Sequence, residues 1–301
     1  MRQVWINGQL QDPHSGAVSA LDAGLQLGLA VFDTLLLDRG CLLFAEEHLA
    51  RLERSARAAE LPWPPPFDPR EGLRALVAAL PVRDASLRLT YSAGAAGEVP
   101  LLIASARPVT HWPADGVRVL VSRHAKLAGD PLEQIKHTNR LRNHLAREEA
   151  RRAGCDEALL PTEAGDLTEG TLSNLFVARD GVLLTAACER GCLAGVTRDH
   201  VVASLRAEPR LAGKRWELRE DRVEPSDLAR ADEVLLTNTS GRVLGVLEVR
   251  GLRADLPGSA GPIARELRAR LDRLEQAERA RSIGTVLAPT RAPERSSGGV
   301  A

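Results

Sequence analysis

A lysine in front of a helix-like segment is the first candidate for chemistry in this chain of 301 residues. Lys136 lies in the run Ile135-Lys136-His137-Thr138-Asn139-Arg140-Leu141, which continues toward Gly154-Cys155-Asp156-Glu157-Ala158. A lysine amine reacts as a nucleophile only in partly desolvated surroundings, because enough of it must be unprotonated. The alternative interpretation of Lys136 is a solvated side chain before a helix.

Two further segments carry side chains or backbone groups suited to binding. Glu169 lies in Leu167-Thr168-Glu169-Gly170-Thr171-Leu172-Ser173-Asn174-Leu175-Phe176, and without this context it would be interpreted as a surface residue of a turn. Gly195-Val196-Thr197-Arg198 precedes a helical pattern, where free N–H groups and the helix dipole suit a phosphate. Taken alone, however, such a segment is usually only a helix cap.

The elements that must position these residues form two groups. In the first hundred residues, strand-like runs at 4–6, 31–37, 41–44, 86–92 and 99–106 accompany helical patterns at 46–61 and 70–80. In the second group, strands are expected at 117–122, 155–160, 173–178, 182–185, 232–237 and 242–247, with helices at 140–153, 197–205 and 262–281.

This alternation predicts a mixed α/β (α+β) fold of two domains. We expect a small N-terminal domain at 1–108, a linker at 109–116, and a larger domain at 117–282 that contains Lys136; the boundary falls in the segment 107–116, which carries Pro108 and Pro113. The segment 283–301 is rich in Pro, Ser, Gly and Arg and is expected to be disordered.

Composition limits the possible partners and compartment. Lys plus Arg equals Asp plus Glu at 40 each, so no global charge favours nucleic acid or an anionic membrane. No apolar run is long enough to span a bilayer. Four cysteines and no secretory leader indicate a reducing, cytoplasmic location. Cys188 and Cys192 lack companions for a metal site, so no metal is expected and both are interpreted as structural.

Four separated segments, spanning most of the chain from Val4 to about Glu278, resemble the signature of fold-type IV pyridoxal-phosphate enzymes, the class IV aminotransferase family. They are the Lys136 run, the Glu169 run, the Gly195 segment and His48-Leu49-Ala50-Arg51-Leu52, with Thr237-Asn238-Thr239-Ser240 as a further match. The resemblance implies a two-domain fold with pyridoxal 5'-phosphate in the interdomain cleft. It also implies a homodimer in which the neighbouring subunit helps to close the site.

The resemblance assigns roles to single residues. Lys136 would form the Schiff base with the cofactor, and the Glu169 carboxylate would face the pyridine nitrogen and keep it protonated. The phosphate would be bound by residues that offer cationic, hydroxyl or backbone N–H donors: Arg51, Val196, Thr197, Thr239 and Ser240.

The reaction is less determined than the cofactor. The run from Lys136 to Leu141 looks most like aminodeoxychorismate lyase, which converts 4-amino-4-deoxychorismate to 4-aminobenzoate and pyruvate for folate synthesis. The alternatives are an aminotransferase acting on D-amino acids or branched-chain amino acids, and a repurposed homologue that binds the cofactor without catalysis.

The segments expected to contact substrate depart from the family pattern. Phe32-Asp33-Thr34 matches it only approximately, and the loop from Ser92 to Glu98 lacks the arginines that the family offers to a substrate carboxylate. A buried carboxylate still needs a cation or several N–H donors. Phe32 and three arginines are therefore the substrate-binding candidates: Arg107, Arg140 and Arg242.

Overall fold

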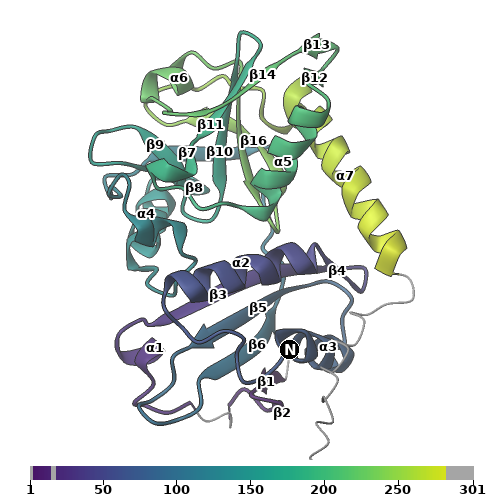
Figure 1. Cartoon of the computed structure of the whole chain (residues 1–301). Coiled ribbons are helices and arrows are strands. Elements are labelled where there is room, and N and C mark those ends of the chain that lie inside the picture. Colours follow the sequence, from purple (N-terminus) through teal and green to yellow (C-terminus); the bar gives the residue numbers. More distant parts are fainter. Residues whose placement is uncertain (1–2, 15–17, 283–301) are drawn as a thin grey trace, which may run out of the picture.

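The computed structural model describes residues 3–14 and 18–282, which form two β-sheets with their covering helices (Figure 1). The mixed α/β architecture expected from the sequence is present, with one sheet on each side of the predicted linker. The expectation of disorder at 283–301 lies outside the described residues.

The first sheet is antiparallel and has six strands in the order β2-β1-β6-β5-β3-β4. Its long central strands are β3, β5 and β6, and alternate residues along each of them face opposite sides. The strands are β1 (Val4–Ile6), β2 (Gln9–Gln11), β3 (Ala30–Asp38), β4 (Cys41–Leu43), β5 (Ala85–Ser92) and β6 (Leu101–Arg107).

One face of this sheet is covered by α2 (Ala45–Ala58) and α3 (Pro69–Ala79). Leu52 of α2 and Leu73 and Leu76 of α3 are fully buried against the sheet. Each such burial contributes about 2 kcal/mol to folding. Asp68 caps α3 by accepting a hydrogen bond from the Arg70 N–H, and a short α1 (Ala23–Gln26) precedes β3. Figure 1 shows α2 along the boundary between the two sheets.

The second sheet is mixed and has eight strands in the order β14-β11-β10-β15-β16-β7-β8-β9. An additional pairing of β9 with β10 makes the sheet curl back on itself, so that Glu169 lies opposite Asn174. The strands are β7 (Val117–Val121), β8 (Glu157–Pro161), β9 (Leu167–Gly170), β10 (Asn174–Arg179), β11 (Val182–Ala186), β14 (Glu217–Asp221), β15 (Glu233–Asn238) and β16 (Arg242–Val249).

Helices surround this sheet and one core joins it to the first. Ala146 and Ala150 of α4 (Leu141–Arg152) pack on β8, while α5 and α7 share a core with Leu36 and Phe44 of the first sheet region. The remaining elements are α5 (Val196–Ala207), α6 (Pro225–Ala229), α7 (Pro262–Ser282), the small strands β12 (Arg210–Leu211) and β13 (Lys214–Arg215), and the 3₁₀ turns η1 (Pro131–Gln134), η2 (Cys188–Arg190) and η3 (Gly258–Ala260).

Candidate active site

A cavity of about 390 Å³ is lined by residues of both sheets. On one side lie β3 and β5, and on the other lie β9, β10, the end of β15 and the start of α5. It brings together nearly every site residue expected from the sequence: Phe32, Arg51, Arg107, Lys136, Arg140, Glu169, Val196, Thr197, Thr239 and Ser240.

Lys136 is held against β3 by its backbone. Its carbonyl accepts a hydrogen bond from Phe32 N at 2.8 Å, and its N–H donates to Ser55 Oγ at 3.2 Å. The amine lies 5.0 Å from the centroid of the Phe32 ring. Burial, and then the nearby Arg51 guanidinium, lower the pKa of Lys136 to about 7. The lowered pKa increases the neutral fraction of the amine near neutral pH, as a nucleophile or proton acceptor requires.

Glu169 is a buried carboxylate in β9, 6 % exposed, with three donors around it. Its Oε1 accepts from Lys126 Nζ at 2.7 Å, and its Oε2 accepts from Leu193 N at 2.9 Å and Asn174 Nδ2 at 3.3 Å. An ionised carboxylate has about four acceptor positions. One acceptor position therefore remains for a donor in the cavity.

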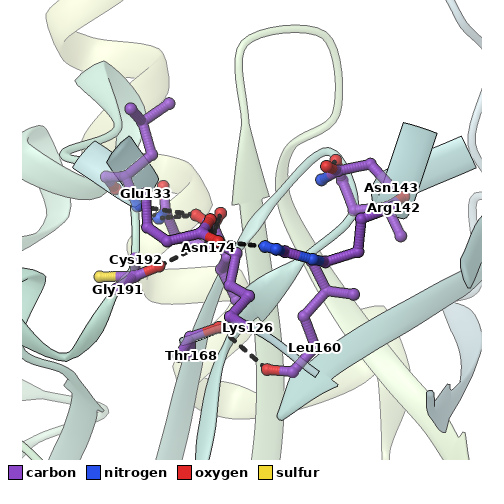
Figure 2. Close-up of polar contacts among 12 residues, drawn as sticks. Lys126, Glu133, Arg142, Asn143, Leu160, Thr168, Asn174, Gly191 and Cys192 are labelled. Atoms are coloured by element: carbon purple, nitrogen blue, oxygen red, sulfur yellow. Dashed lines mark hydrogen bonds and ion pairs between the residues drawn. The ribbon is translucent and has the colours of Figure 1, made fainter. Parts of the chain in front are cut away.

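Lys126 completes a buried charge network beside the cavity (Figure 2). Besides Glu169 it contacts Glu133 at 3.1 Å and donates to the Gly191 carbonyl at 2.7 Å. Burial alone would lower the pKa of Lys126, but Glu169 and Glu133 offset it and raise the pKa above its usual range. Lys126 therefore stays charged and is no competitor of Lys136 as a nucleophile.

Arg51 projects from α2 and is held by a carboxylate within the first sheet. Its Nε and Nη2 donate to the two oxygens of Asp33 at 2.8 Å each, and its Nη1 donates to the Ala194 carbonyl at 3.2 Å. His48 Nδ1 lies 2.7 Å from Asp33 Oδ1. Burial raises the pKa of Asp33, but Arg51 and His48 more than offset this and hold that pKa well below its usual range. The guanidinium is thus fixed before any ligand arrives.

The start of α5 provides uncommitted donors close to Arg51. No side chain caps this helix at Gly195, so its first N–H groups are available to an anion. A Cβ at Gly195 would lie 2.0 Å from Asn174 Oδ1, so the close approach requires glycine. Thr237 Oγ1, at the cavity wall, is buried and has no hydrogen-bond partner among the described residues. This unpaired hydroxyl, the free N–H groups and Arg51 fit a phosphate group.

The opposite end of the cavity carries arginines that have no acidic partner within residues 3–14 and 18–282. Arg88 and Arg107 lie on the same face of neighbouring strands, because Arg88 pairs with Ser105 and Arg107 with Ser86. Burial, followed by the charges of Arg107 and Arg140, lowers the pKa of Arg88 to about 10. Arg147 of α4 also lines the cavity, and its Nη1 is buried without a partner among the described residues.

Six basic side chains and one carboxylate line the cavity, so it favours anionic ligands beyond a single phosphate. Arg242, expected to bind substrate, does not belong to this wall. Its Nε donates to Glu275 at 2.7 Å and its Nη2 lies 3.5 Å from Asp38, which commits it to an ion-pair network on α7. The cavity does not support the expectation that Arg242 binds substrate, and that expectation stays a prediction.

Several residues of the site were missed at the level of sequence. Arg88 carried a usable signal, since it is the polar residue of an alternating Leu-Arg-Leu strand and must face away from the apolar core. Asp33 and Lys126 carried no such signal, because their importance comes from partners 18 and 43 positions away.

The fold and the site define a class of protein, the pyridoxal-phosphate enzymes in which a lysine and a glutamate face a cavity between two α/β units. The sequence model of the class IV amino-transferases matches residues 30–249. The chain belongs to the class IV aminotransferase family, and it is an enzyme of the pyridoxal-phosphate-dependent type.

Relatives and solved structures agree with this assignment. A putative branched-chain-amino-acid aminotransferase of Methanocaldococcus jannaschii is 30% identical over 263 residues, covering 83% of this chain and 88% of the relative. D-alanine aminotransferase of Bacillus licheniformis is 29% identical and is covered completely, across 93% of this chain. A branched-chain amino acid aminotransferase from T.th. with pyridoxamine 5'-phosphate has a TM-score of 0.81 at 26% identity, covering 93% and 96% of the two chains.

A hypothetical aminotransferase from Mycobacterium tuberculosis in its PLP-bound form has a TM-score of 0.77 at 25% identity. The match covers 92% of this chain and 99% of that one. The two-domain fold-type IV architecture and the pyridoxal-phosphate cofactor expected from the sequence are confirmed by these likenesses.

Proposed function

We propose that this protein is an aminotransferase that moves an amino group between an α-amino acid and a 2-oxo acid. The observation that carries the proposal is the cavity itself, where the buried Lys136 amine, with its lowered pKa, and the Glu169 carboxylate lie between a proposed phosphate-binding end and arginines that have no acidic partner among the described residues. Named relatives among branched-chain and D-alanine aminotransferases support it.

Pyridoxal phosphate, when bound, supplies an electron sink for the negative charge that develops at the substrate's α-carbon. In the proposed site, Arg51, Thr197, Thr237 and the N–H groups at the start of α5 would hold its phosphate. Glu169, which accepts a hydrogen bond from Lys126, would offer its remaining acceptor position to the ring nitrogen and favour a proton there.

Lys136 performs the proton transfers in this scheme. Its amine has a pKa of about 7, so it can take up a proton from the α-carbon and return it at neutral pH. The basic wall orients the substrate through its carboxylate, with Arg88 stacked over Phe32 at 3.6 Å between its Cζ and the ring centroid. A planar guanidinium fixed in this way can donate two hydrogen bonds to one carboxylate.

The lyase of 4-aminobenzoate synthesis remains the second candidate. It is favoured by the run from Lys136 to Leu141 and by a cavity whose charge suits a substrate with two carboxylates. The named relatives favour the aminotransferase over it.

One experiment separates the two reactions. The cofactor-loaded protein is incubated with L-leucine or D-alanine plus 2-oxoglutarate, and separately with 4-amino-4-deoxychorismate. Glutamate formation that disappears in Lys136→Ala is the expected result, and the preferred amino acid reports the stereochemistry. Release of 4-aminobenzoate and pyruvate without any oxo acid, and without glutamate formation in the first assay, would contradict the aminotransferase.

We further propose that the protein acts as a homodimer. Five large apolar side chains are exposed, and one of them, Leu172, lines the cavity: Leu21, Leu25, Leu27, Leu141 and Leu172. Their segments are contiguous, because the Gly28 carbonyl accepts from Asn139 Nδ2 and the Thr171 carbonyl accepts from Asn143 Nδ2. An apolar patch of this kind commonly marks a protein interface. Light scattering should report twice the chain mass, and a monomer at micromolar concentration would contradict the proposal.

A cytoplasmic location is proposed on the state of the thiols. All four cysteines are free in the structure, as expected in a reducing compartment. Among the described residues, no helix has the length and apolar content needed to cross a membrane.

A further inference from the structure

Two cysteines meet immediately behind the cofactor end of the cavity. Cys188 starts η2 and is half-buried, whereas Cys192 is only 1 % exposed. Their sulfur atoms are 3.9 Å apart, and the Cys192 thiol also donates to the Ala186 carbonyl at 3.3 Å. Among the described residues, no group of three potential metal ligands exists that could recruit this pair. Two adjacent thiols without a metal are suited to redox chemistry.

The two thiols differ in pKa, as the oxidation of one thiol followed by attack of the other requires. The hydrogen bond from Cys192, and then the positive charge of Arg198, lower the pKa of the Cys188 thiol. The same hydrogen bond, followed by burial, raises the pKa of Cys192. Arg198 itself is fixed, because it donates to the Ala186 carbonyl at 3.0 Å and to Glu220 at 2.7 Å. Cys188 is therefore the accessible nucleophile, and the buried Cys192 is the resolving thiol that forms the disulfide with it.

The backbone after these cysteines binds the side chains of the cofactor site. The Gly191 carbonyl accepts from Lys126 (Figure 2), and the Leu193 N–H donates to Glu169. The Ala194 carbonyl accepts from Arg51 at 3.2 Å. Cys192 lies between Gly191 and Leu193 in the chain. A displacement of Cys192 therefore moves the Leu193 N–H that donates to Glu169 and the Gly191 carbonyl that accepts from Lys126.

We propose that Cys188 and Cys192 are a reversible thiol-oxidation site whose disulfide weakens cofactor binding. The oxidant is a hydroperoxide. The Cys188 thiolate attacks its O–O bond and becomes a sulfenic acid, with release of an alcohol or water. The Cys192 thiol then attacks the sulfenic sulfur, a disulfide forms, and the sulfenic oxygen leaves as water. Two electrons pass from the thiols to the peroxide, and a dithiol reductant returns them.

Geometry links the bond to the cofactor site. A disulfide requires a sulfur separation of about 2.05 Å, so the sulfur atoms must approach by roughly 2 Å. Cys192 is enclosed by Ala186 and the β11 core, and its movement displaces the adjacent Leu193 N–H from Glu169 Oε2. Loss of one hydrogen bond to a charged group corresponds to about a tenfold change in an equilibrium constant.

The test uses the full-length protein with and without a stoichiometric excess of hydrogen peroxide. Unfolding in iodoacetamide should alkylate four cysteines in the reduced protein and two in the oxidised protein, and peptide mapping should place the disulfide between 188 and 192. In parallel, pyridoxal phosphate is titrated into the protein freed of cofactor, and the dissociation constant should rise about tenfold on oxidation and return with dithiothreitol.

The variants make the result specific. Cys188→Ser should keep its three thiols alkylatable and its cofactor affinity unchanged under peroxide. Cys41→Ser and Cys155→Ser are matched controls, because these cysteines lie elsewhere in the fold, and both should still form the disulfide. Four alkylatable thiols after peroxide would overturn the proposal. A disulfide with cofactor affinity unchanged within twofold would overturn its link to the cofactor.

The proposal rests on the cofactor site described above, and the two measurements separate their failures. If the reduced protein binds no pyridoxal phosphate, both the proposed function and the effect of the disulfide on cofactor affinity are overturned. The alkylation count would still decide whether the disulfide exists.

Discussion

The two ends of the cavity differ in how their charges are neutralised. At the cofactor end, Arg51 is paired with Asp33, and Lys126 is paired with Glu169 and Glu133. At the end proposed to bind substrate, Arg88, Arg107 and Arg147 have no acidic partner among the described residues. The first end is organised before binding, which lowers the cost of ordering on association. The second end holds uncompensated positive charge that only an incoming anion neutralises.

This difference explains how a common cofactor can be retained while the substrate varies. A paired network constrains both partners, since removing one leaves a buried charge unpaired and costs about 3–5 kcal/mol. Unpaired arginines at the cavity wall carry no such mutual constraint. We expect substitutions there to change which anion binds and to leave the rest of the site in place.

The largest expected effect on turnover comes from substitution of Lys136, which lies between the two ends of the cavity. Lys136→Ala should reduce turnover by about 10³-fold or more, since both the amine and the proton carrier are lost. Borohydride reduction of the cofactor-loaded protein, followed by peptide mapping, should label Lys136 and spare Lys126 and Lys214, the other lysines of the chain. Label on Lys126 would refute the assignment, and Lys214→Ala is the matched control.

Glu169→Gln should separate two functions of the cofactor end, the support of turnover and the binding of the cofactor. The amide keeps the size of the side chain but removes the negative charge that holds a proton on the ring nitrogen. Turnover should fall by about 10²-fold, while cofactor stays bound through its phosphate. Turnover of loaded protein and the cofactor dissociation constant are measured together. Unchanged turnover would remove Glu169 from the proposed mechanism.

Arg88→Gln tests the substrate end. We expect KM for the amino acid or the oxo acid to rise about 10- to 100-fold, because one charge-assisted interaction is worth about 1.5–3 kcal/mol. Cofactor affinity should stay unchanged. Arg215→Gln, on the exposed strand β13, is the control and should behave as the unmodified protein. A loss of cofactor affinity without a change in KM would contradict the role of Arg88 in substrate binding and would indicate that it binds the cofactor.

The smallest effect concerns the pH dependence. Lys136 has a pKa of about 7, and Asp33 is among the charges that raise it while Arg51 lowers it. The rate of cofactor uptake should therefore increase as pH rises through about 7 and level off above it. In Asp33→Asn the raising charge is gone, so the midpoint should move to lower pH. A midpoint that moves upward, or a rate independent of pH between about 5 and 9, would contradict this role of Asp33.

Much of the fold was predictable because its elements carry strong local patterns. The helices at 45–58, 141–152 and 262–282 were expected within a few residues of their observed bounds. The strand β14 was not expected, since Glu-Leu-Arg-Glu-Asp is almost entirely charged; it is stabilised by pairing with β11 at the sheet edge and by contacts with residues distant in sequence. Local pattern cannot reveal a strand whose residues are kept in place by a neighbour distant in sequence.

The sequence by itself identified the cofactor, and it predicted the reactive lysine and the positions of a phosphate-binding end, because contiguous motifs such as 135–141, 167–176 and 195–198 carry them. Only the tertiary structure decided which side chains contact one another. It paired Arg51 with Asp33, engaged Arg242 with Glu275 away from the cavity, turned Arg88 toward it and set Cys188 beside Cys192. Charge pairing and side-chain direction depend on contacts between strands and helices far apart in the chain, which the order of residues does not specify locally.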